Sequence, residues 1–262
     1  MKCTFCDRSV FGSRYRFYSV DYTFEMIKTL HTKYGIKDLL FEDDSFTLQK
    51  NRVVALCNKL LDNNLKISWS CLGRIDCIDA DMLAMMKKAG CWQIGFGIES
   101  GNADILHSVE KKTSIGRIQE ALTVTKKAGI HTKGFFIVGL PNETEKSVQE
   151  TIRFAKAIDL DDISVSFCTP FPGTVLNQNI AGCGTFDPDW RKMNLMNAVF
   201  VPTGLTKAQL EKFHASFFRS FYLRPRIVRD YFFRSIVNVK IGIRLFRGMC
   251  TFFSFRIRKG QK

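Results

Sequence analysis

The chain has 262 residues, of which 45% are apolar and 24% are charged, and this composition is typical of a folded globular protein rather than a disordered one. Its formal net charge is +14, but residues 219–262 hold twelve Lys or Arg and one acid and therefore carry +11 of that total. The remaining body carries only +3, which argues against a nucleic-acid-binding face spread over the whole protein.

The body alternates short strand patterns with amphipathic helix patterns. Helices are predicted at residues 21–34, 49–61, 79–89, 114–128 and 144–157, and strands at residues 38–41, 66–70, 92–98, 131–138 and 162–167. Gly90 and Gly129 follow two of these helices, at a position where glycine tolerates the left-handed conformation. A unit of strand plus helix that recurs every 30–40 residues or so predicts a parallel sheet or barrel with helices outside.

The alternation ends near Pro170. Residues 175–202 are predicted to be irregular, and residues 206–222 return to a helix pattern, with Thr206 as a cap before Gln209. We therefore expect three parts: a barrel core at residues 1–174, an irregular and helical extension at 175–222, and a basic amphipathic helical tail at 223–262.

Polar or turn-forming motifs follow each of the five predicted strands. They are FEDDSF at 41–46, CLGRID at 71–76, GIESG at 97–101, GLPNET at 139–144 and TPFPGT at 169–174. Each motif alone is best explained as a turn, a helix cap or a surface acid. Because active sites of parallel βα folds lie at the carboxyl ends of the strands, five such motifs in order predict one functional rim.

The chain begins with a Cys-x-x-Cys pair, Cys3 and Cys6, with Phe5 between the two thiols. Two thiolates at this spacing can hold one metal ion or one edge of an iron–sulfur cluster. Most of the other seven cysteines lie in apolar runs, where a buried small hydrophobe is the simplest interpretation. No signal peptide precedes Cys3, so we expect a cytoplasmic chain whose cysteines are thiols or metal ligands rather than disulfides.

Together, the N-terminal CTFCDRS motif and the motifs at 41–47, 97–101, 139–144 and 169–174 resemble those of the radical S-adenosylmethionine enzymes. Within them, the chain is similar to the cobalamin-associated group that includes the anaerobic Mg-protoporphyrin monomethyl ester cyclases. The fold that this resemblance implies is α/β, a partial (β/α)6 TIM-like barrel lacking its first strand, with a C-terminal helical extension.

The resemblance also implies an activity. It is the reductive cleavage of S-adenosylmethionine by a 4Fe–4S cluster, which starts radical chemistry, methyl transfer or oxidative cyclisation, on an organic and hydrophobic small-molecule substrate. The partner it implies is an electron donor such as a ferredoxin or flavodoxin.

Individual residues acquire roles through the same resemblance. Cys3 and Cys6 would be two of the three cluster ligands. The cofactor-binding positions that it implies are Phe5 beside the adenine, Glu42 and Asp43 at the amino group, Arg74 at the carboxylate, Glu99 with Ser100 at the ribose, and Leu140 and Pro141 at the adenine slot.

The first cluster cysteine of the family would stand two residues before Met1. We interpret the chain as an N-terminally truncated fragment or a misassigned start, with cobalamin, where used, bound by a missing N-terminal domain. The alternative is a replacement ligand from elsewhere in the chain. Cys71 is the best candidate, although a thiol packed inside the barrel explains it more simply.

The tail at residues 223–258 mixes apolar and basic residues with helical spacing. Charges interrupt every apolar run, so a transmembrane span is not expected. One helical arc would be basic, with Arg226, Arg229, Lys240, Arg244 and Arg247. The neighbouring arc would be apolar, with Phe232, Ile236, Val239, Ile243 and Phe246. Such a helix can lie on an anionic membrane surface, at which the protein would be peripheral, or pack on the barrel with its Arg stems extended.

Two other functions stay open. An RNA-modifying radical methylthiotransferase would also be basic, but it would need a strand-rich RNA-binding appendage where this chain has a helical tail. A non-catalytic barrel that binds zinc or no metal is the other alternative, because the first cluster cysteine is absent.

Overall fold

The computed structural model describes residues 3–7, 12 and 14–237. The chain forms two compact units, Met1–Phe218 and Arg219–Lys262, which are considered separately. The basic and apolar positions predicted between Val239 and Arg247 lie outside the described residues.

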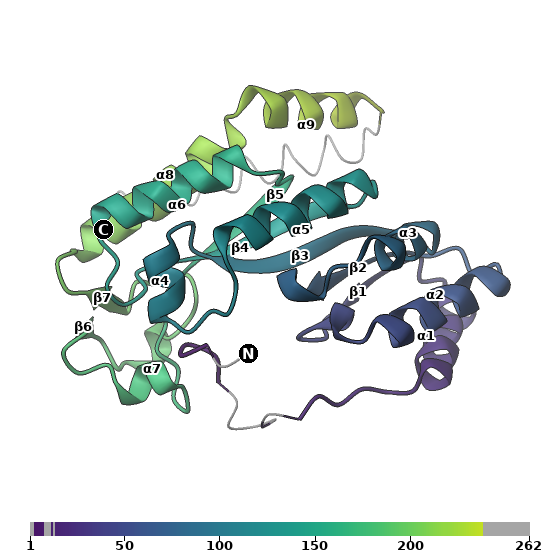
Figure 1. Cartoon of the computed structure of the whole chain (residues 1–262), viewed down its shortest axis with the longest axis horizontal. Coiled ribbons are helices and arrows are strands. Elements are labelled where there is room, and N and C mark those ends of the chain that lie inside the picture. The colour runs from purple at the N-terminus through teal and green to yellow at the C-terminus, as the bar shows by residue number, and fades with distance from the viewer. Residues whose placement is uncertain (1–2, 8–11, 13, 238–262) are drawn as a thin grey trace. The chain divides into compact units, whose positions relative to one another are not determined.

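The first unit is built on a sheet of five parallel strands (Figure 1). These are β1 (Asp38–Phe41), β2 (Ser68–Gly73), β3 (Cys91–Glu99), β4 (His131–Val138) and β5 (Asp162–Phe167), and each strand pairs with the next one along the chain. Parallel strands in sequence order, joined by helices, give the curled sheet of a partial TIM-like barrel. The predicted α/β fold class is therefore confirmed.

Helices cover the sheet, one before the first strand and the others between successive strands. They are α1 (Val20–Tyr34), α2 (Lys50–Asp62), α3 (Ala80–Lys88), α4 (Ala103–Ser108), α5 (Ile115–Lys127) and α6 (Glu145–Ala157). Most begin at a polar side chain that accepts a hydrogen bond from a backbone N–H of the first turn, as Ser114 and Thr144 do. Gly90 and Gly129 have φ values of +96° and +74°, as predicted for glycines that follow helices.

Two differences from the predicted elements concern the edges of the site. β2 continues to Gly73, so Cys71 lies within the strand instead of following it. The six-residue helix α4 was not predicted, because it is too short to show a helical period.

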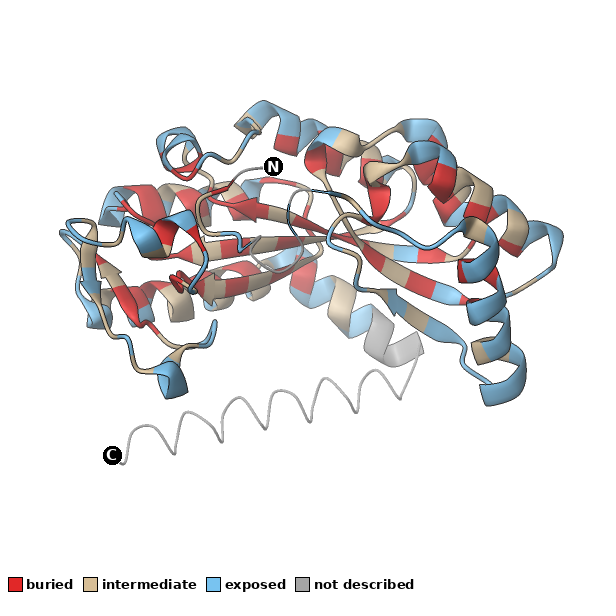
Figure 2. Ribbon diagram, turned by 90° about the horizontal axis from the view of Figure 1, so that it is seen from below, coloured by how far each residue is buried: buried red, intermediate tan, exposed pale blue. Residues whose placement is uncertain are grey.

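Side chains alternate between two faces along β4 and β5, with every second residue buried (Figure 2). Large apolar side chains such as Trp69, Phe96 and Phe136 are almost completely buried and form the core. The half-buried positions between them lie on the opposite face of the sheet, because successive strand side chains point to opposite sides.

The segment after β5 carries more regular structure than expected. It contains α7 (Val175–Gln178), an antiparallel pair formed by β6 (Gly184–Phe186) and β7 (Phe200–Pro202), and α8 (Lys207–Tyr222). Thr206 and Gln209 form the predicted cap, since the Gln209 N–H donates to the Thr206 hydroxyl and the Thr206 N–H donates to the Gln209 side chain. Short 3-10 turns occur at Phe46–Leu48, Ile75–Cys77 and Trp190–Lys192.

The second unit contains the end of α8 and α9 (Pro225–Val237). Among the side chains described in this unit, exposed apolar ones are those of Leu223, Val228, Phe232 and Phe233. Among helices of the described residues, none combines the length and the apolar character needed to cross a bilayer.

Candidate functional site

The N-terminal thiols lie in one tight turn. The Cys6 N–H donates to the Cys3 carbonyl over 3.2 Å, which closes the turn and brings the two side chains together. The contact with the Cys6 thiol lowers the pKa of Cys3 to about 7, whereas the same contact raises the pKa of Cys6 above its ordinary value. One of the two sulfurs is therefore prepared to be a thiolate near neutral pH, the form that binds metals.

Backbone hydrogen bonds hold this turn against the carboxyl ends of the strands. The Thr4 N–H donates to the Val109 carbonyl (3.1 Å), and the Leu176 N–H donates to the Thr4 carbonyl (2.8 Å). Phe5 packs against an apolar cluster made of Ile105, Val109, Leu140, Cys168, Leu176 and Phe200. Because these residues follow β3, β4 and β5, the Cys3–Cys6 turn lies at the predicted rim.

Glu99, the last residue of β3, forms a buried ion pair with Lys111. The Lys111 Nζ lies 2.8 Å from Glu99 Oε1, and the two side chains are only 9% and 10% exposed. The strand register with β4 shifts between Gly97 and Glu99, and Glu99 has a φ of +68°, a region that non-glycine residues rarely occupy. Strain of this kind tends to occur at functional sites.

The ion pair and the thiols act on one another. Lys111 lowers and Glu99 raises the pKa of both Cys3 and Cys6, so all four groups share one electrostatic neighbourhood. The sequence-predicted cysteines and Glu99 are thus brought together. Sequence reasoning missed Lys111, and the one available signal was a Lys-Lys pair just after the loop that follows β3.

Ser100 and Arg74 are both engaged by protein groups. The Ser100 hydroxyl lies 3.0 Å from that of Thr151 on α6 and accepts from the Asn102 N–H. Arg74 makes a two-pronged contact with Asp76, with Nε–Oδ1 and Nη2–Oδ2 distances of 3.0 and 2.6 Å. The hydrogen bonds between the two side chains raise the pKa of Arg74 and lower the pKa of Asp76. The Arg74 guanidinium is therefore already paired with a carboxylate of the protein.

The acids after β1 differ in exposure. Glu42 is exposed, whereas Asp43 is half-buried. Burial raises the pKa of Tyr15, and the Asp43 carboxylate adds to this, so the two side chains are neighbours. The Tyr15 hydroxyl donates to the Ser45 carbonyl (3.3 Å), which ties the segment that precedes α1 to this strand end.

The turn after β4 is closed by a buried carboxyl group. Glu143 Oε2 accepts from the N–H groups of Gly139 (2.6 Å) and Leu140 (3.3 Å). Burial raises the pKa of Glu143 to about 8, although these two hydrogen bonds oppose the shift. Leu140 and Pro141 are both buried, and Leu140 belongs to the apolar cluster on which Phe5 packs.

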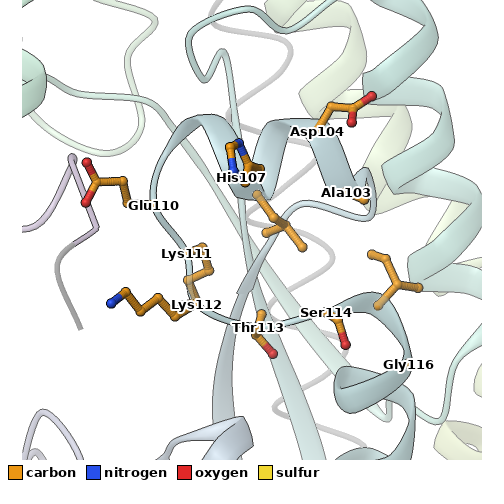
Figure 3. A pocket seen from close by; sticks show the side chains of 11 residues that line it. Ala103, Asp104, His107, Glu110, Lys111, Lys112, Thr113, Ser114 and Gly116 are labelled. Atoms are coloured by element: carbon orange, nitrogen blue, oxygen red, sulfur yellow. The ribbon is translucent and has the colours of Figure 1, made fainter.

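A pocket of about 830 Å³ lies beside the ion pair, between α4 and α5 (Figure 3). Its walls come from residues 103, 104, 106, 107 and 110–116, and Lys111 belongs both to this wall and to the Glu99 pair. The rim therefore has open space next to its buried cation.

The residues present fit part of an iron–sulfur site. Cys3 and Cys6 are thiolate donors of the right type, held three positions apart. Over residues 3–7, 12 and 14–237, no group of three His, Cys, Asp or Glu side chains is arranged to hold a metal ion. The described chain thus supplies two of the three thiolates that an open 4Fe–4S cluster requires.

Cys71 does not lie with the N-terminal pair. Burial raises its pKa well above the ordinary value, with the Cys91 and Cys57 thiols as its sulfur neighbours. Because Cys57 is part of α2, these neighbours place Cys71 between the sheet and its helices. Cys71 is therefore a packed thiol, although not inside the barrel as expected, and this geometry does not fit a replacement cluster ligand.

Comparison with known proteins gives a family match over most of the barrel. A family model described as the radical SAM superfamily matches residues 1–155. An uncharacterised methyltransferase of Pyrococcus horikoshii is 36% identical over 245 residues, which are 92% of this chain and 53% of that protein. An anaerobic magnesium-protoporphyrin IX monomethyl ester cyclase of Cereibacter sphaeroides is 28% identical, over 86% of this chain and 37% of its own length.

A solved structure shares the fold. The cobalamin-dependent S-adenosylmethionine radical enzyme OxsB, with aqua-cobalamin and S-adenosylmethionine bound, has a TM-score of 0.65 and 18% identity, over 82% of this chain and 38% of that one. The chain thus spans about half, or less, of the length of these relatives.

Proposed function

Because this chain belongs to the radical SAM superfamily, a family of enzymes that use S-adenosylmethionine and a 4Fe–4S cluster, we propose that its barrel rim binds both groups and starts radical chemistry on an organic substrate. The observation that carries this proposal is the shared neighbourhood of the Cys3–Cys6 turn and the Glu99–Lys111 pair. When bound, the reduced cluster would supply one electron to the sulfonium of S-adenosylmethionine. The sulfonium–carbon bond would then break and give methionine and a 5′-deoxyadenosyl radical.

The chain's own residues would bind and orient these groups. Cys3 and Cys6 would hold the cluster as thiolates. Glu99 would accept hydrogen bonds from the ribose hydroxyls, since a carboxylate has two acceptor oxygens. Lys111, released from Glu99, would neutralise the methionyl carboxylate. Arg74, which would have to be released from Asp76, is the second candidate, because Lys111 is the cation that acts on the Cys3–Cys6 pair.

Two further parts of the rim complete the proposed site. Glu42 and Asp43 would face the methionyl amino group, with Ser100 holding the turn after Glu99 through Thr151. Phe5, Leu140 and Pro141 would form the apolar side of the adenine slot, which their burial in or against one apolar cluster supports.

The test is anaerobic reconstitution, with iron and sulfide, of the chain extended at its N-terminus so that a cysteine stands four residues before Cys3, followed by dithionite and S-adenosylmethionine. We expect protein-bound iron and sulfide, and 5′-deoxyadenosine as product. Cys3→Ala and Cys6→Ala should remove the iron, whereas Cys77→Ala, a half-buried cysteine whose thiol contacts Asp76 and not the Cys3–Cys6 turn, should keep it. Unchanged iron content and cleavage in Cys3→Ala would overturn the assignment, and zinc in place of iron would favour the non-catalytic scaffold.

The finer activity that we propose is methyl transfer or oxidative cyclisation on a hydrophobic small molecule. The names of the relatives, a methyltransferase and a cyclase, support it. Cobalamin would assist through protein outside this chain, and a ferredoxin or flavodoxin would be the electron source. Transfer of label from methyl-labelled S-adenosylmethionine to RNA rather than to an extractable small molecule would favour the methylthiotransferase alternative.

We also propose that the protein is cytoplasmic and that its second unit contacts an anionic membrane surface, at which the protein would be peripheral. Leu223, Phe232 and Phe233 are 67%, 62% and 58% exposed in a segment that carries +11. Exposed apolar side chains beside basic ones are the combination that binds anionic lipid.

Vesicle co-sedimentation tests the membrane proposal. The chain should pellet with phosphatidylglycerol-containing vesicles and stay in solution with phosphatidylcholine alone. Phe232→Ser/Phe233→Ser should lose this binding, and Trp190→Ser, which removes an exposed aromatic of the first unit, should not. Equal binding to both kinds of vesicle, or none to either, would contradict the proposal.

A further inference from the structure

Glu143 is a buried carboxyl group to which the cofactor chemistry assigns no task. It is 1% exposed, and its Oε1 has no hydrogen-bond partner in the described part of the chain. Burial of a carboxyl group is unfavourable unless hydrogen bonds within the protein compensate for the lost hydration. The hydrogen bonds of Glu143 are made with the backbone, since Oε2 accepts from the N–H groups of both Gly139 and Leu140.

These hydrogen bonds stabilise the turn that follows β4. Gly139 and Asn142 have φ values of +89° and +63°, so the backbone leaves the strand conformation on both sides of Leu140. The Glu143 N–H also donates to the Leu140 carbonyl over 3.1 Å. Glu143 therefore holds this turn through its side chain and its main chain together.

The turn leads to the N-terminal thiols through apolar packing. Leu140 is completely buried in the cluster on which Phe5 packs, and Phe5 lies between Cys3 and Cys6 in the sequence. The Cys168 thiol of the same cluster is close enough to Glu143 for the carboxylate to add to the effect of burial, which raises its pKa. The Glu143 carboxyl group thus lies next to the apolar cluster on which the Cys3–Cys6 turn packs through Phe5.

We propose that Glu143 is a positioning residue: by fixing the turn after β4, it presses Leu140 into the apolar cluster and so orders the Cys3–Cys6 turn and the cofactor slot beside it. The part that concerns S-adenosylmethionine rests on the proposed function. The part that concerns the order of the two turns does not, and it can be measured without any cofactor.

Amide hydrogen exchange of the metal-free chain tests the packing. Glu143→Leu, which keeps the volume but accepts no hydrogen bond, should speed exchange at residues 139–140 and at residues 3–6 by about tenfold or more. Glu143→Gln keeps one acceptor oxygen and should stay close to the wild type. Glu145→Gln, an exposed glutamate at the start of α6, is the matched control.

Leu140→Ala separates the two links of the argument. It should free residues 3–6 while leaving the Gly139 amide protected, because Glu143 can still accept from it. Unchanged exchange at residues 3–6 in either Glu143→Leu or Leu140→Ala would overturn the proposal. If Glu143→Leu fails to fold, Leu140→Ala decides alone: unchanged exchange at residues 3–6 in that variant would overturn the proposal.

Affinity for S-adenosylmethionine gives the second readout. In reconstituted protein, Glu143→Leu should weaken binding by about tenfold and Glu143→Gln by less than about threefold. A wild-type chain that binds no S-adenosylmethionine but shows the expected exchange pattern would remove the proposed function and leave the positioning role standing. Normal affinity in Glu143→Leu, together with unchanged exchange at residues 3–6, would remove the positioning role alone.

Discussion

Two groups of cysteines in this chain show how strongly the surroundings decide what a thiol does. Cys3 and Cys6 lie at the rim in contact with each other, next to the Lys111 cation, and the pKa of Cys3 is lowered to about 7. Cys57 of α2 and Cys71 of β2 are buried near Cys91, and burial raises the pKa of Cys57 to about 12 and that of Cys71 well above its usual value. The rim thiols are suited to bind metal, and the buried ones to fill space.

The largest expected effect is a difference in reactivity between the two groups. At pH 7 the peptide that contains Cys3 and Cys6 should react with iodoacetamide about 100-fold faster than peptides that contain Cys57 or Cys71. Cys3 contributes thiolate character and Cys6 contributes exposure, whereas Cys57 and Cys71 are buried and have raised pKa values. Mass spectrometry of the metal-free chain measures the rates. Similar rates for the two groups would break the comparison.

Loss of the rim cation should make the rim thiols resemble the buried ones. Lys111→Met leaves the Glu99 carboxylate buried without its partner, which should cost about 3 kcal/mol of unfolding free energy. The pKa of Cys3 should rise at the same time, because Lys111 helps to lower it. Urea unfolding and the pH dependence of alkylation check both effects.

Two further variants control for this change. Lys112→Met alters an exposed neighbouring lysine and should change neither quantity. Adding Glu99→Gln to Lys111→Met should restore part of the stability. If Lys111→Met alone were as stable as the wild type, the Glu99–Lys111 ion pair would not contribute to the free energy of unfolding.

The buried carboxyl of the rim should give stability its own pH dependence. The pKa of Glu143 is about 8 in the folded chain and 4.5 in the unfolded one, so between these pH values the unfolded state binds fewer protons. Stability should therefore be fully present below pH 4.5 or so and fall as pH rises toward 8, by up to about 1.4 kcal/mol per pH unit. Urea unfolding of the wild type and of Glu143→Gln at several pH values isolates this effect as the difference between their free energies of unfolding. A difference that does not change with pH would contradict the prediction.

The smallest effect expected concerns the glycine under the ion pair. A Cβ on Gly97 would lie 2.5 Å from Glu99 Oε1 and 3.0 Å from Lys111 Nζ, so Gly97→Ala must displace both side chains. Because their ends can move, we expect a loss of about 1 kcal/mol in thermal or urea unfolding. Gly116→Ala, in the first turn of α5 with open space around it, should be neutral or slightly stabilising. Equal effects at both positions would mean that the pair is not confined by Gly97.

Much of the fold followed from local patterns. Caps such as Thr144 and glycines such as Gly129 end elements by interactions within a few residues, so the sequence shows them directly. The five parallel strands followed from the alternation itself. The β6–β7 pair could not be predicted, because its strands are three residues long and owe their conformation to each other.

The site divides along the same line. By itself, the sequence indicated that Glu99 belongs to a rim, since motifs that follow successive parallel strands must meet at one end of the sheet, and the family resemblance added Cys3 and Cys6 to that rim. Only the tertiary structure decided that Lys111 is the cation beside them, that Arg74 is taken by Asp76, and that Glu143 closes the turn behind Leu140. The reason is physical: strand order fixes which backbones are neighbours, whereas the partner of a buried charge depends on how loops return over the rim.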